Sequence, residues 1–267
     1  MYTIADLRDY SARKKRIRPS TYRMWEIASR RIANQPYVAF KDPRMVERFI
    51  ESVEKDWSDA TIKTRLGYIG SMYQVAMEEN KIDFEKNPFH GAGRRFKYLT
   101  KTYPYKPFEH FKRFHNDPLF MGLWWHGMRV EELAGILPEE IVTDAPIPHF
   151  VLRHNHVRFL KTDASVRLVP IYEPWLQFLP DFKFSTNPRE GDNRSRQYKK
   201  WCGISAHGFR NYVRDRCLDN DISDSVCSRI CGWAIGGTKG IYGQDVKLSA
   251  MENALNTINK EWIEYKR

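Results

Sequence analysis

Apolar positions recur at helical spacing in three successive segments between residues 20 and 80. The first spans residues 21–35 and follows two hydroxylated residues that can cap a helix. The second begins at Asp42 and Pro43, a capping residue followed by a first-turn proline. The third follows Ser58, and its apolar stripe consists of Ile62, Leu66, Ile69, Met72, Tyr73 and Ala76. These segments predict a small helical bundle.

The pattern changes after Asn87 and Pro88, where glycines and prolines replace the helical period. Beyond this stretch, short helical patterns surround runs that are rich in β-branched and aromatic residues. The runs predict a small antiparallel sheet with strands at residues 150–153, 157–161 and 166–171. Helices are predicted at residues 108–116, 119–126, 129–137, 195–201, 206–218, 222–231 and 248–265, and after Pro174.

These patterns predict a mostly helical α+β protein with two domains. We expect a helical domain at residues 1–90, a linker at 91–106 and a mixed α/β domain at 107–267. The chain has 267 residues, which suits two domains of ordinary size.

The charge of the chain indicates what kind of partner it binds. The chain has 44 Lys and Arg residues against 33 Asp and Glu, a formal charge of +11. Basic residues gather in an N-terminal block, in the linker and in the last third of the chain. Three clusters with few compensating acids indicate a nucleic-acid partner. We expect phosphate contacts from Arg13, Lys14, Lys15, Arg16, Arg18, Arg94, Arg95, Lys97, Lys199 and Lys200.

The sequence excludes several other classes. Its longest apolar stretch is too short for a membrane span, and charged residues stand where a secretory signal would be apolar. We therefore expect a cytoplasmic protein. Four cysteines lie in the last quarter without zinc-ribbon spacing, and we expect reduced, mostly buried thiols. Neither a metal site nor a Walker-type phosphate loop is predicted.

Candidate chemistry begins with His207 and Arg210. Three residues apart on a predicted helix, they lie on one face and can point at the same phosphate. This spacing is common by chance, but it belongs to an ordered series. The series runs GMRVEEL (127–133), KTDASVRLVP (161–170), HGFR (207–210), CGW (231–233) and IYG (241–243).

The ordered motifs closely resemble those of the tyrosine recombinase family, which includes phage integrases. The resemblance covers most of the chain, and the N-terminal helices are similar to the family's SAM-like core-binding domain. It implies a DNA breaking-rejoining catalytic domain that needs neither metal nor cofactor. Its catalytic residues would be Arg129, Lys161, His207, Arg210, Trp233 and Tyr242.

Each residue then receives a chemical role. Tyr242 would be the nucleophile that forms a 3′-phosphotyrosyl bond. Arg129 and Arg210 would hold the non-bridging phosphate oxygens, while Lys161 would protonate the leaving 5′ oxygen. His207 would donate a hydrogen bond or accept the tyrosine proton. Trp233 stands where the family more often has His and can donate through its indole N–H. Glu132 would orient Arg129, and His126 is expected to have a packing role.

The resemblance also implies partners. Double-stranded DNA attachment sites would be the substrate, and integration or excision of a phage or mobile element would be the outcome. The amphipathic C-terminal segment would dock on a neighbouring protomer in a DNA-bound homo-tetramer, with packing on its own domain as the alternative. Excision often needs an accessory directionality factor.

Three other functions are alternatives to site-specific recombination. A type IB topoisomerase would use the same chemical roles. A catalytically silent DNA-binding or architectural protein could keep the fold, although the intact residue set argues against it. A metal-dependent nuclease would need carboxylates such as Asp219 and Asp221, or Glu139 and Glu140, which lack a partnered pattern.

Overall fold

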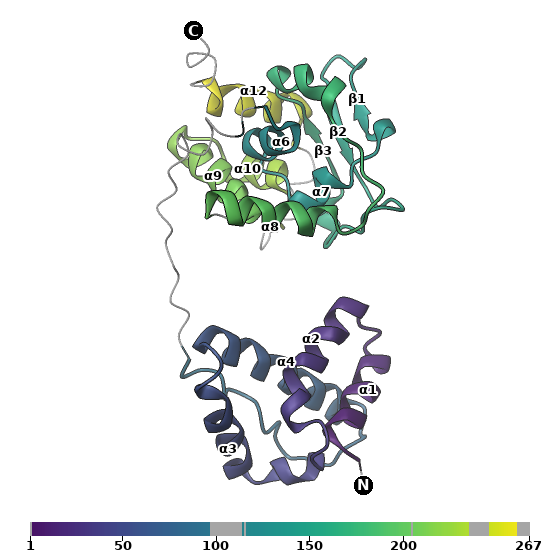
Figure 1. Cartoon of the computed structure of the whole chain (residues 1–267), viewed down its shortest axis with the longest axis vertical. Coiled ribbons are helices and arrows are strands. Elements are labelled where there is room, and N and C mark those ends of the chain that lie inside the picture. Colours follow the sequence, from purple (N-terminus) through teal and green to yellow (C-terminus); the bar gives the residue numbers. More distant parts are fainter. Residues whose placement is uncertain (1, 97–113, 115, 204, 235–245, 261–267) are drawn as a thin grey trace. The chain divides into compact units, whose positions relative to one another are not determined.

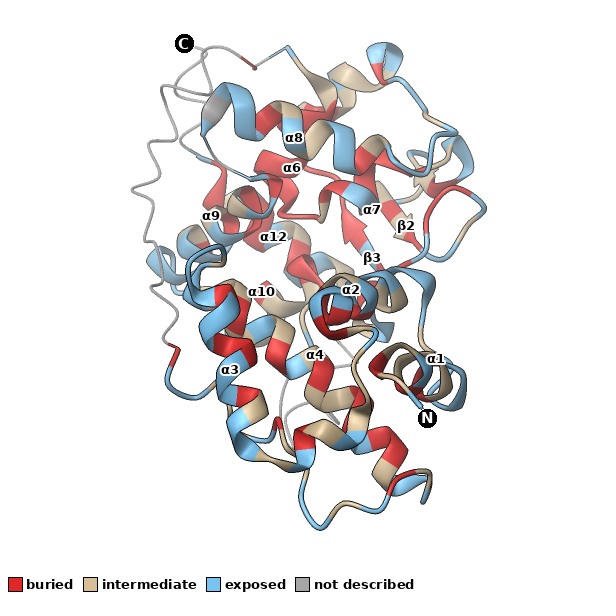
Figure 2. Ribbon diagram, turned by 60° about the horizontal axis from the view of Figure 1, so that its bottom comes forward, coloured by how far each residue is buried: buried red, intermediate tan, exposed pale blue. Residues whose placement is uncertain are grey.

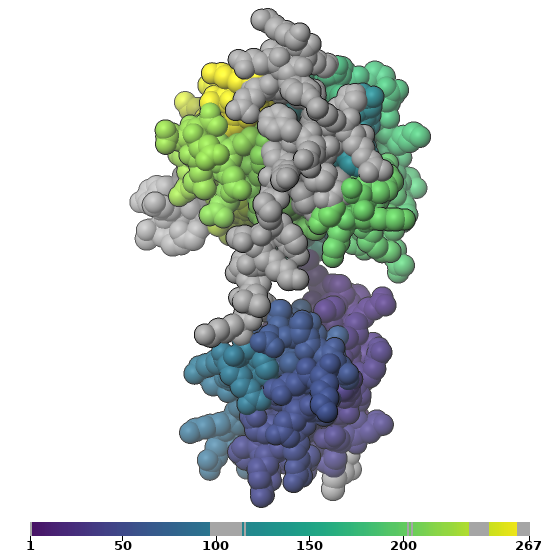
Figure 3. Space-filling model, turned by 60° about the vertical axis from the view of Figure 1, so that its left-hand side comes forward, coloured from purple at the N-terminus to yellow at the C-terminus, as the bar shows by residue number. Residues whose placement is uncertain are grey.

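The computed structural model describes residues 2–96, 114, 116–203, 205–234 and 246–260. The chain divides into two compact units, Met1–Thr102 and Tyr103–Arg267, and each is considered by itself (Figure 1). Figure 3 shows one outer face of each unit, coloured along the sequence.

The first unit is helical. Its described elements are α1 (Ile4–Lys14), α2 (Pro19–Ser29), α3 (Pro43–Glu54), α4 (Asp59–Glu78) and the 3-10 turns Arg30–Ile32 and Tyr37–Lys41. The side chains of Asp42 and Ser58 cap α3 and α4, as the sequence predicted. The predicted apolar stripe of α4 is buried and faces α1 and α2 (Figure 2).

Helix α1 was not predicted. Only Ile4, Leu7 and Ala12 give it a buried apolar side, so its periodicity is weak among many charged residues. A capping box was nevertheless present in the sequence. The Thr3 hydroxyl accepts from the Asp6 amide, and the Asp6 carboxylate accepts from the Thr3 amide at 2.8 Å.

The second unit combines helices with a small sheet. Its described helices are α6 (Pro118–His126), α7 (Val130–Ala134), α8 (Glu190–Cys202), α9 (Ala206–Asp219), α10 (Asp224–Cys231) and α12 (Leu248–Ile258). The 3-10 turns are Pro138–Glu140, Asp163–Ser165 and Glu173–Asp181. Helix α6 is buried all round, packs against α9 and carries His126, whose imidazole accepts the Tyr172 amide (Figure 2). Burial lowers the pKa of His126 to about 4, so it is neutral and serves packing.

The sheet has the order β1-β2-β3 and is antiparallel, with strands Ile141–Val142, His149–Leu152 and Arg167–Pro170. Phe150 lies opposite Ile141 on one side and Val169 on the other. Thus the predicted strands at 150–153 and 166–171 correspond to β2 and β3, while β1 was not predicted. The mostly helical α+β fold class is confirmed.

The predicted strand at residues 157–161 was wrong, because these residues form an irregular loop. Side chains replace a strand partner there. The Asn155 carboxamide oxygen accepts from the Val157 and Arg158 amides, and the Leu160 amide donates to His154. The prediction for Lys161 at a strand end is corrected accordingly: it lies on this loop between β2 and β3.

Several helix boundaries also differ from prediction. Helix α7 is shorter than residues 129–137, and α8 begins five residues before the predicted 195. The segment after Pro174 is a 3-10 helix. Most of the predicted helix at 108–116 and the end of the predicted C-terminal helix at 261–265 lie outside the described residues.

Candidate active site

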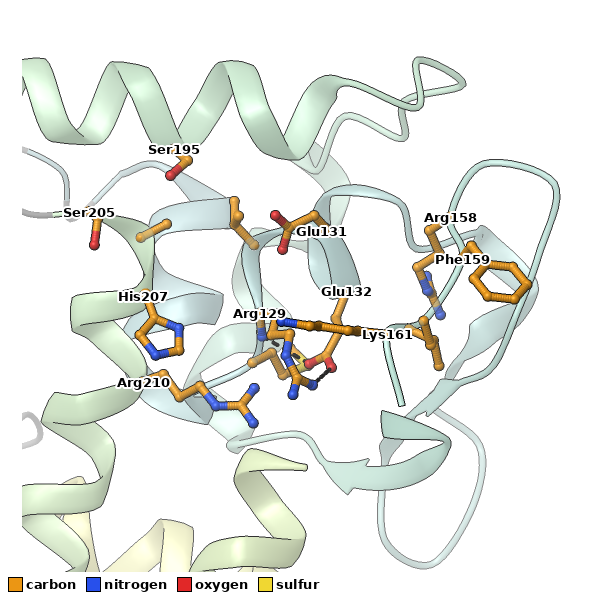
Figure 4. Close-up of a pocket in the computed structure, with 14 residues that line it drawn as sticks. Arg129, Glu131, Glu132, Arg158, Phe159, Lys161, Ser195, Ser205, His207 and Arg210 are labelled. Atoms are coloured by element: carbon orange, nitrogen blue, oxygen red, sulfur yellow. Dashed lines mark hydrogen bonds and ion pairs between the residues drawn. The ribbon is translucent and has the colours of Figure 1, made fainter. Parts of the chain in front are cut away.

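Five nitrogen-bearing side chains line one pocket of the second unit, and four of them are predicted catalytic residues from three separate segments. The pocket has a volume of about 450 Å³. Arg129 enters from the start of α7, Lys161 from the loop between β2 and β3, and His207 and Arg210 from the first turns of α9. Figure 4 shows the Lys161 side chain reaching toward Arg129, with Arg210 pointing to the same space. Four of the six predicted catalytic residues thus line one pocket, and a fifth, Trp233, contacts Arg210.

Arg129 is held in place by four hydrogen bonds. Its Nη1 donates to Glu132 Oε1 at 2.7 Å and to Ser165 Oγ at 2.8 Å. Its Nη2 donates to the Gly232 carbonyl at 3.3 Å, and its backbone amide donates to Glu132 Oε2. The side chain is nevertheless 21% exposed, so the guanidinium is fixed while part of it faces the pocket.

Glu132 is a buried carboxylate shared by two arginines. Its side chain is 1% exposed, and Oε2 accepts from Arg167 Nη2 at 2.9 Å. Burial alone would raise the pKa of Glu132, but Arg167 and the bonds from Arg129 hold it below its ordinary value. The carboxylate therefore stays ionised and orients Arg129, which is the place that the sequence prediction gave it.

Arg167 is a site residue that the sequence analysis missed. Its side chain is fully buried, and each of its three guanidinium nitrogens has a partner. Nε donates to the Ile230 carbonyl, Nη1 to Ser165 O and Glu132, and Nη2 to Glu132. The available signal was an arginine in an otherwise apolar strand, RLVP, where an inward position demands a carboxylate.

Arg210 has the opposite environment. It is fully buried, yet none of its three guanidinium nitrogens has a hydrogen-bond partner among the described residues. Its guanidinium carbon lies 4.9 Å from the centre of the Trp233 ring. Burial and the neighbouring charge of Arg129 lower its pKa to about 10, which still leaves it protonated at neutral pH. A buried cation of this kind is suited to an anion.

His207 lies one turn before Arg210 on α9. Burial lowers the pKa of its imidazole, and Arg210, Arg129 and Lys161 lower it further. The ring is therefore neutral at pH 7 and has a nitrogen available to accept a proton. Lys161 is exposed at the pocket edge on its loop.

The C-terminal end of α10 contacts three arginines of the site, Arg129, Arg167 and Arg210. The Ile230 carbonyl accepts from Arg167, the Gly232 carbonyl accepts from Arg129, and the Trp233 ring lies against Arg210. Gly232 ends the helix with a φ of 64°, and a Cβ there would lie 2.4 Å from Arg167 Nη1. Glycine is favoured at this position, because the left-handed backbone strains a side chain and the Arg167 guanidinium occupies the space that a Cβ would need.

Comparison with solved structures identifies the fold. A segment of the Tn1549 transposon integrase in complex with transposon right end DNA aligns with 96% of this chain and 98% of its own. The TM-score is 0.62 and the identity 16%. The same integrase with circular intermediate DNA aligns with 99% of this chain and 100% of its own, with TM-score 0.59 and identity 16%. This chain has the tyrosine recombinase fold.

Other comparisons add little to this result. XerA recombinase aligns with 99% of this chain and 98% of its own at 14% identity, but with a TM-score of only 0.39. No family model and no curated protein matches the sequence. The recombinase fold is therefore established by structure, over nearly the whole chain.

The predicted nucleophile and one predicted DNA contact lie outside the part of the chain that the structure describes. Tyr242 and Lys97 are the residues concerned. Trp233 is described, half-buried, and covers Arg210 with its ring face.

The remaining predicted phosphate contacts are exposed. They are Arg13, Lys14, Lys15, Arg16 and Arg18 around the end of α1, Arg94 and Arg95 after α4, and Lys199 and Lys200 near the end of α8. Lys14 forms an ion pair with Glu79 at 2.8 Å. Arg95 pairs with Glu47 at 2.7 Å and with Glu54 at 3.4 Å. Those two residues have acidic neighbours that a phosphate would have to displace.

The carboxylates considered for a nuclease do not form a site. Glu140 is fully buried and pairs with Arg158 at 2.9 Å. Within the described ranges, no three His, Cys, Asp or Glu side chains are grouped so that they could hold a metal ion. Among the same residues, no helix is long and apolar enough to cross a membrane.

Proposed function

We propose that this protein is a site-specific DNA recombinase that cleaves and rejoins strands through a 3′-phosphotyrosyl bond at Tyr242. One observation carries the proposal: the buried Arg210 guanidinium, without a described hydrogen-bond partner, lies in one pocket with Arg129, Lys161 and His207. Tetrahedral phosphate oxygens can satisfy such a group of donors.

The reaction assigns a distinct task to each group. Arg129 and Arg210 hold the two non-bridging oxygens and stabilise the charge that develops on them. The Tyr242 phenolate attacks phosphorus, with its proton passing to the neutral His207. The 5′ oxygen leaves and takes a proton from Lys161. Reversal of these steps by another 5′ hydroxyl reseals the strand.

Arg167 and Glu132 act as positioning residues. The Glu132 carboxylate fixes the direction of Arg129 through two hydrogen bonds, and Arg167 keeps that carboxylate ionised. Trp233 lies against the face of the Arg210 guanidinium, and a phosphate would supply the hydrogen-bond acceptors that its buried nitrogens lack among the described residues. The pocket is thus prepared before DNA binds.

Integration or excision of a mobile element is the favoured biological outcome. It is supported by the fold shared with an integrase of the Tn1549 transposon that was solved with transposon DNA. Attachment-site DNA would be the partner, with a homo-tetramer on the DNA and an accessory factor for excision. The apolar side of α12 (Met251, Leu255 and Ile258) packs on α9, α10 and β3 of its own unit, so this side is not the contact between protomers. Exposed basic residues of the first unit would hold the DNA backbone.

A covalent-trapping assay tests the chemistry. The protein is incubated with a pool of nicked duplexes that tile the DNA on either side of its gene, and complexes that survive denaturation are counted. We expect a covalent complex without added Mg²⁺ that Tyr242→Phe abolishes. Tyr212→Phe, which keeps the ring of another tyrosine in the second unit, is the matched control and should retain the complex. Undiminished product with Tyr242→Phe would refute the nucleophile assignment.

Strand exchange separates a recombinase from a topoisomerase. When two duplexes that form the covalent complex are mixed, a recombinase yields recombinant strands and a junction intermediate. A type IB topoisomerase yields no recombinant strands. It only relaxes a supercoiled plasmid that carries the same site. Relaxation without exchange would replace the recombinase proposal with the topoisomerase alternative.

A further inference from the structure

Three cysteine thiols meet behind the candidate active site. Cys217 comes from α9, and Cys227 and Cys231 from α10. All three are free and buried, and they belong to the apolar cluster in which α9, α10 and α12 meet. Cys227 and Cys231 lie one turn apart on α10, and α10 packs against α9, which carries Cys217.

Cys227 differs from the other two in its access to the surface. It lines a second, open pocket of about 260 Å³, whose other walls come from Arg214, Leu218, Asp224, Ser228 and Trp233. Cys217 and Cys231 do not line this pocket. Of the three cysteines, Cys227 is therefore the one that a small molecule in this pocket lies against, beside the cation of Arg214.

The charge around Cys227 favours its reactive form. Hydrogen bonds from Cys217 and Cys231 lower the pKa of Cys227, and the charges of Arg214 and Arg210 add to this against the opposing effect of burial. The pKa values of Cys217 and Cys231 are raised, because each donates to Cys227. Thiolates that are accessible and lie near cations are the cysteines that oxidants attack.

We propose that Cys227 is a redox-sensitive thiol that a hydroperoxide oxidises and that Cys217 then resolves as a disulfide. The Cys227 thiolate attacks one peroxide oxygen, the O–O bond breaks, and Cys227 sulfenic acid and hydroxide form. The Cys217 sulfur then attacks the Cys227 sulfur, the S–S bond forms, and water leaves. Two sulfurs are oxidised and the peroxide is reduced.

Helix geometry selects Cys217 as the resolving residue. Cys227 and Cys231 are four residues apart on one helix, where Cβ atoms lie about 5–6 Å from each other. A disulfide needs Cβ atoms about 3.5–4.5 Å apart, so α10 would have to deform to join them. Cys217 approaches from a different helix and is free of this constraint.

The bond would act on the candidate active site through α10. At the C-terminal end of that helix, the Ile230 and Gly232 carbonyls accept hydrogen bonds from Arg167 and Arg129. The following Trp233 ring lies against Arg210. A shift of α10 toward α9 therefore moves the supports of all three arginines together. This consequence for catalysis rests on the proposed function, whereas the thiol chemistry does not.

Mass spectrometry of the native full-length protein tests the thiol chemistry. After brief exposure to hydrogen peroxide, dimedone should label Cys227 ahead of Cys217 and Cys231, and longer exposure should join the peptides of Cys217 and Cys227. Cys217→Ala should keep the dimedone adduct and lose the disulfide. Equal or slower labelling of Cys227, or a bond from Cys227 to Cys231 instead, would overturn the assignment.

Covalent trapping tests the coupling to the active site. Peroxide should reduce formation of the DNA complex by roughly 10- to 100-fold, the scale of an ångström of misplacement, and dithiothreitol should restore it. Cys227→Ser should be resistant, while Cys202→Ser should remain sensitive. If the disulfide forms and trapping is unchanged, the coupling is wrong. If the reduced protein traps no DNA, the proposed function fails while the disulfide result stands.

Discussion

Arg167 and Arg210 are both buried arginines of the same unit, and both approach the end of α10, but their surroundings differ completely. Every guanidinium nitrogen of Arg167 has a protein partner, including the ionised Glu132. None of the Arg210 nitrogens has a partner among the described residues. Burial of a charge costs free energy unless it is paired. The difference separates an arginine that maintains the site from one that is available to a ligand.

The largest expected effect is the loss of stability when the ion pair between Arg167 and Glu132 is broken. Glu132→Gln leaves Arg167 buried without a counter-charge, and such a loss destabilises a protein by about 3–5 kcal/mol. Urea unfolding followed at the tryptophans, most of which lie in the second unit, measures the change. Glu139→Gln, an exposed glutamate of the same unit, is the control and should be close to neutral. A change below about 1 kcal/mol for Glu132→Gln would mean that water already solvates Arg167.

The same carboxylate predicts a pH dependence of stability. Because the pKa of Glu132 is lower in the folded state than its ordinary 4.5, it contributes stability that is present above pH 4.5. That contribution is lost as pH falls through the folded value. Glu132→Gln should therefore lose less stability than the wild type over this acid range.

The next largest effect is on the rate of DNA cleavage when Arg210 is replaced. Arg210→Met should reduce the rate of covalent DNA cleavage by about 10²–10³-fold, the cost of removing one preorganised donor. Its free energy of unfolding should not fall, because a buried charge without a protein partner is removed. Single-turnover trapping and urea unfolding give both values. Arg214→Met, one turn later on α9 and exposed, should cleave normally. A large loss of stability in Arg210→Met would place Arg210 in the same class as Arg167.

A smaller effect is expected where arginines and lysines are exposed rather than buried. Replacing Arg13 and Lys15 at the end of α1 with glutamine should lower DNA affinity. The slope of log K against log salt concentration should become shallower by about two. Lys55 and Lys86 provide an exposed control pair in the same unit. Binding measured at several salt concentrations tests this. An unchanged slope would remove the end of α1 from the DNA interface.

The smallest effect is the position of one titration. The pKa of His207 lies below its ordinary 6.5, so the neutral base persists to lower pH. The second-order rate of cleavage, which reports the free enzyme, should fall on the acid side only below pH 6.5. His207→Gln should lose that acid limb. An acid limb at or above 6.5 would mean that His207 is not the proton acceptor.

The sequence specified the elements whose signals are local. Asp42 and Ser58 cap helices where predicted, and the stripe of α4 is buried. The motifs also anticipated that Arg129, Lys161, His207 and Arg210 would meet, although they lie far apart in the chain. Order and spacing of motifs, rather than any single residue, made that prediction possible.

Other features depend on partners that are distant in sequence. The apolar and aromatic run at 157–161 has strand composition, but Asn155 and His154 satisfy its amides instead. The pairing of Arg167 with Glu132 joins residues 35 positions apart. Access to Cys227 depends on how α9 and α10 pack. None of these has a periodic signature that a sequence pattern could show.

Gly232 carries a consequence for how such a site can evolve. Its backbone turns the chain out of α10, its carbonyl holds Arg129, and its missing side chain leaves room for Arg167. A substitution there would strain the backbone and push against the Arg167 guanidinium at the same time. The neighbouring Trp233 presents only a ring face to Arg210, a task that another flat side chain can perform. We therefore expect sequence variation among related proteins to be greater at position 233 than at position 232.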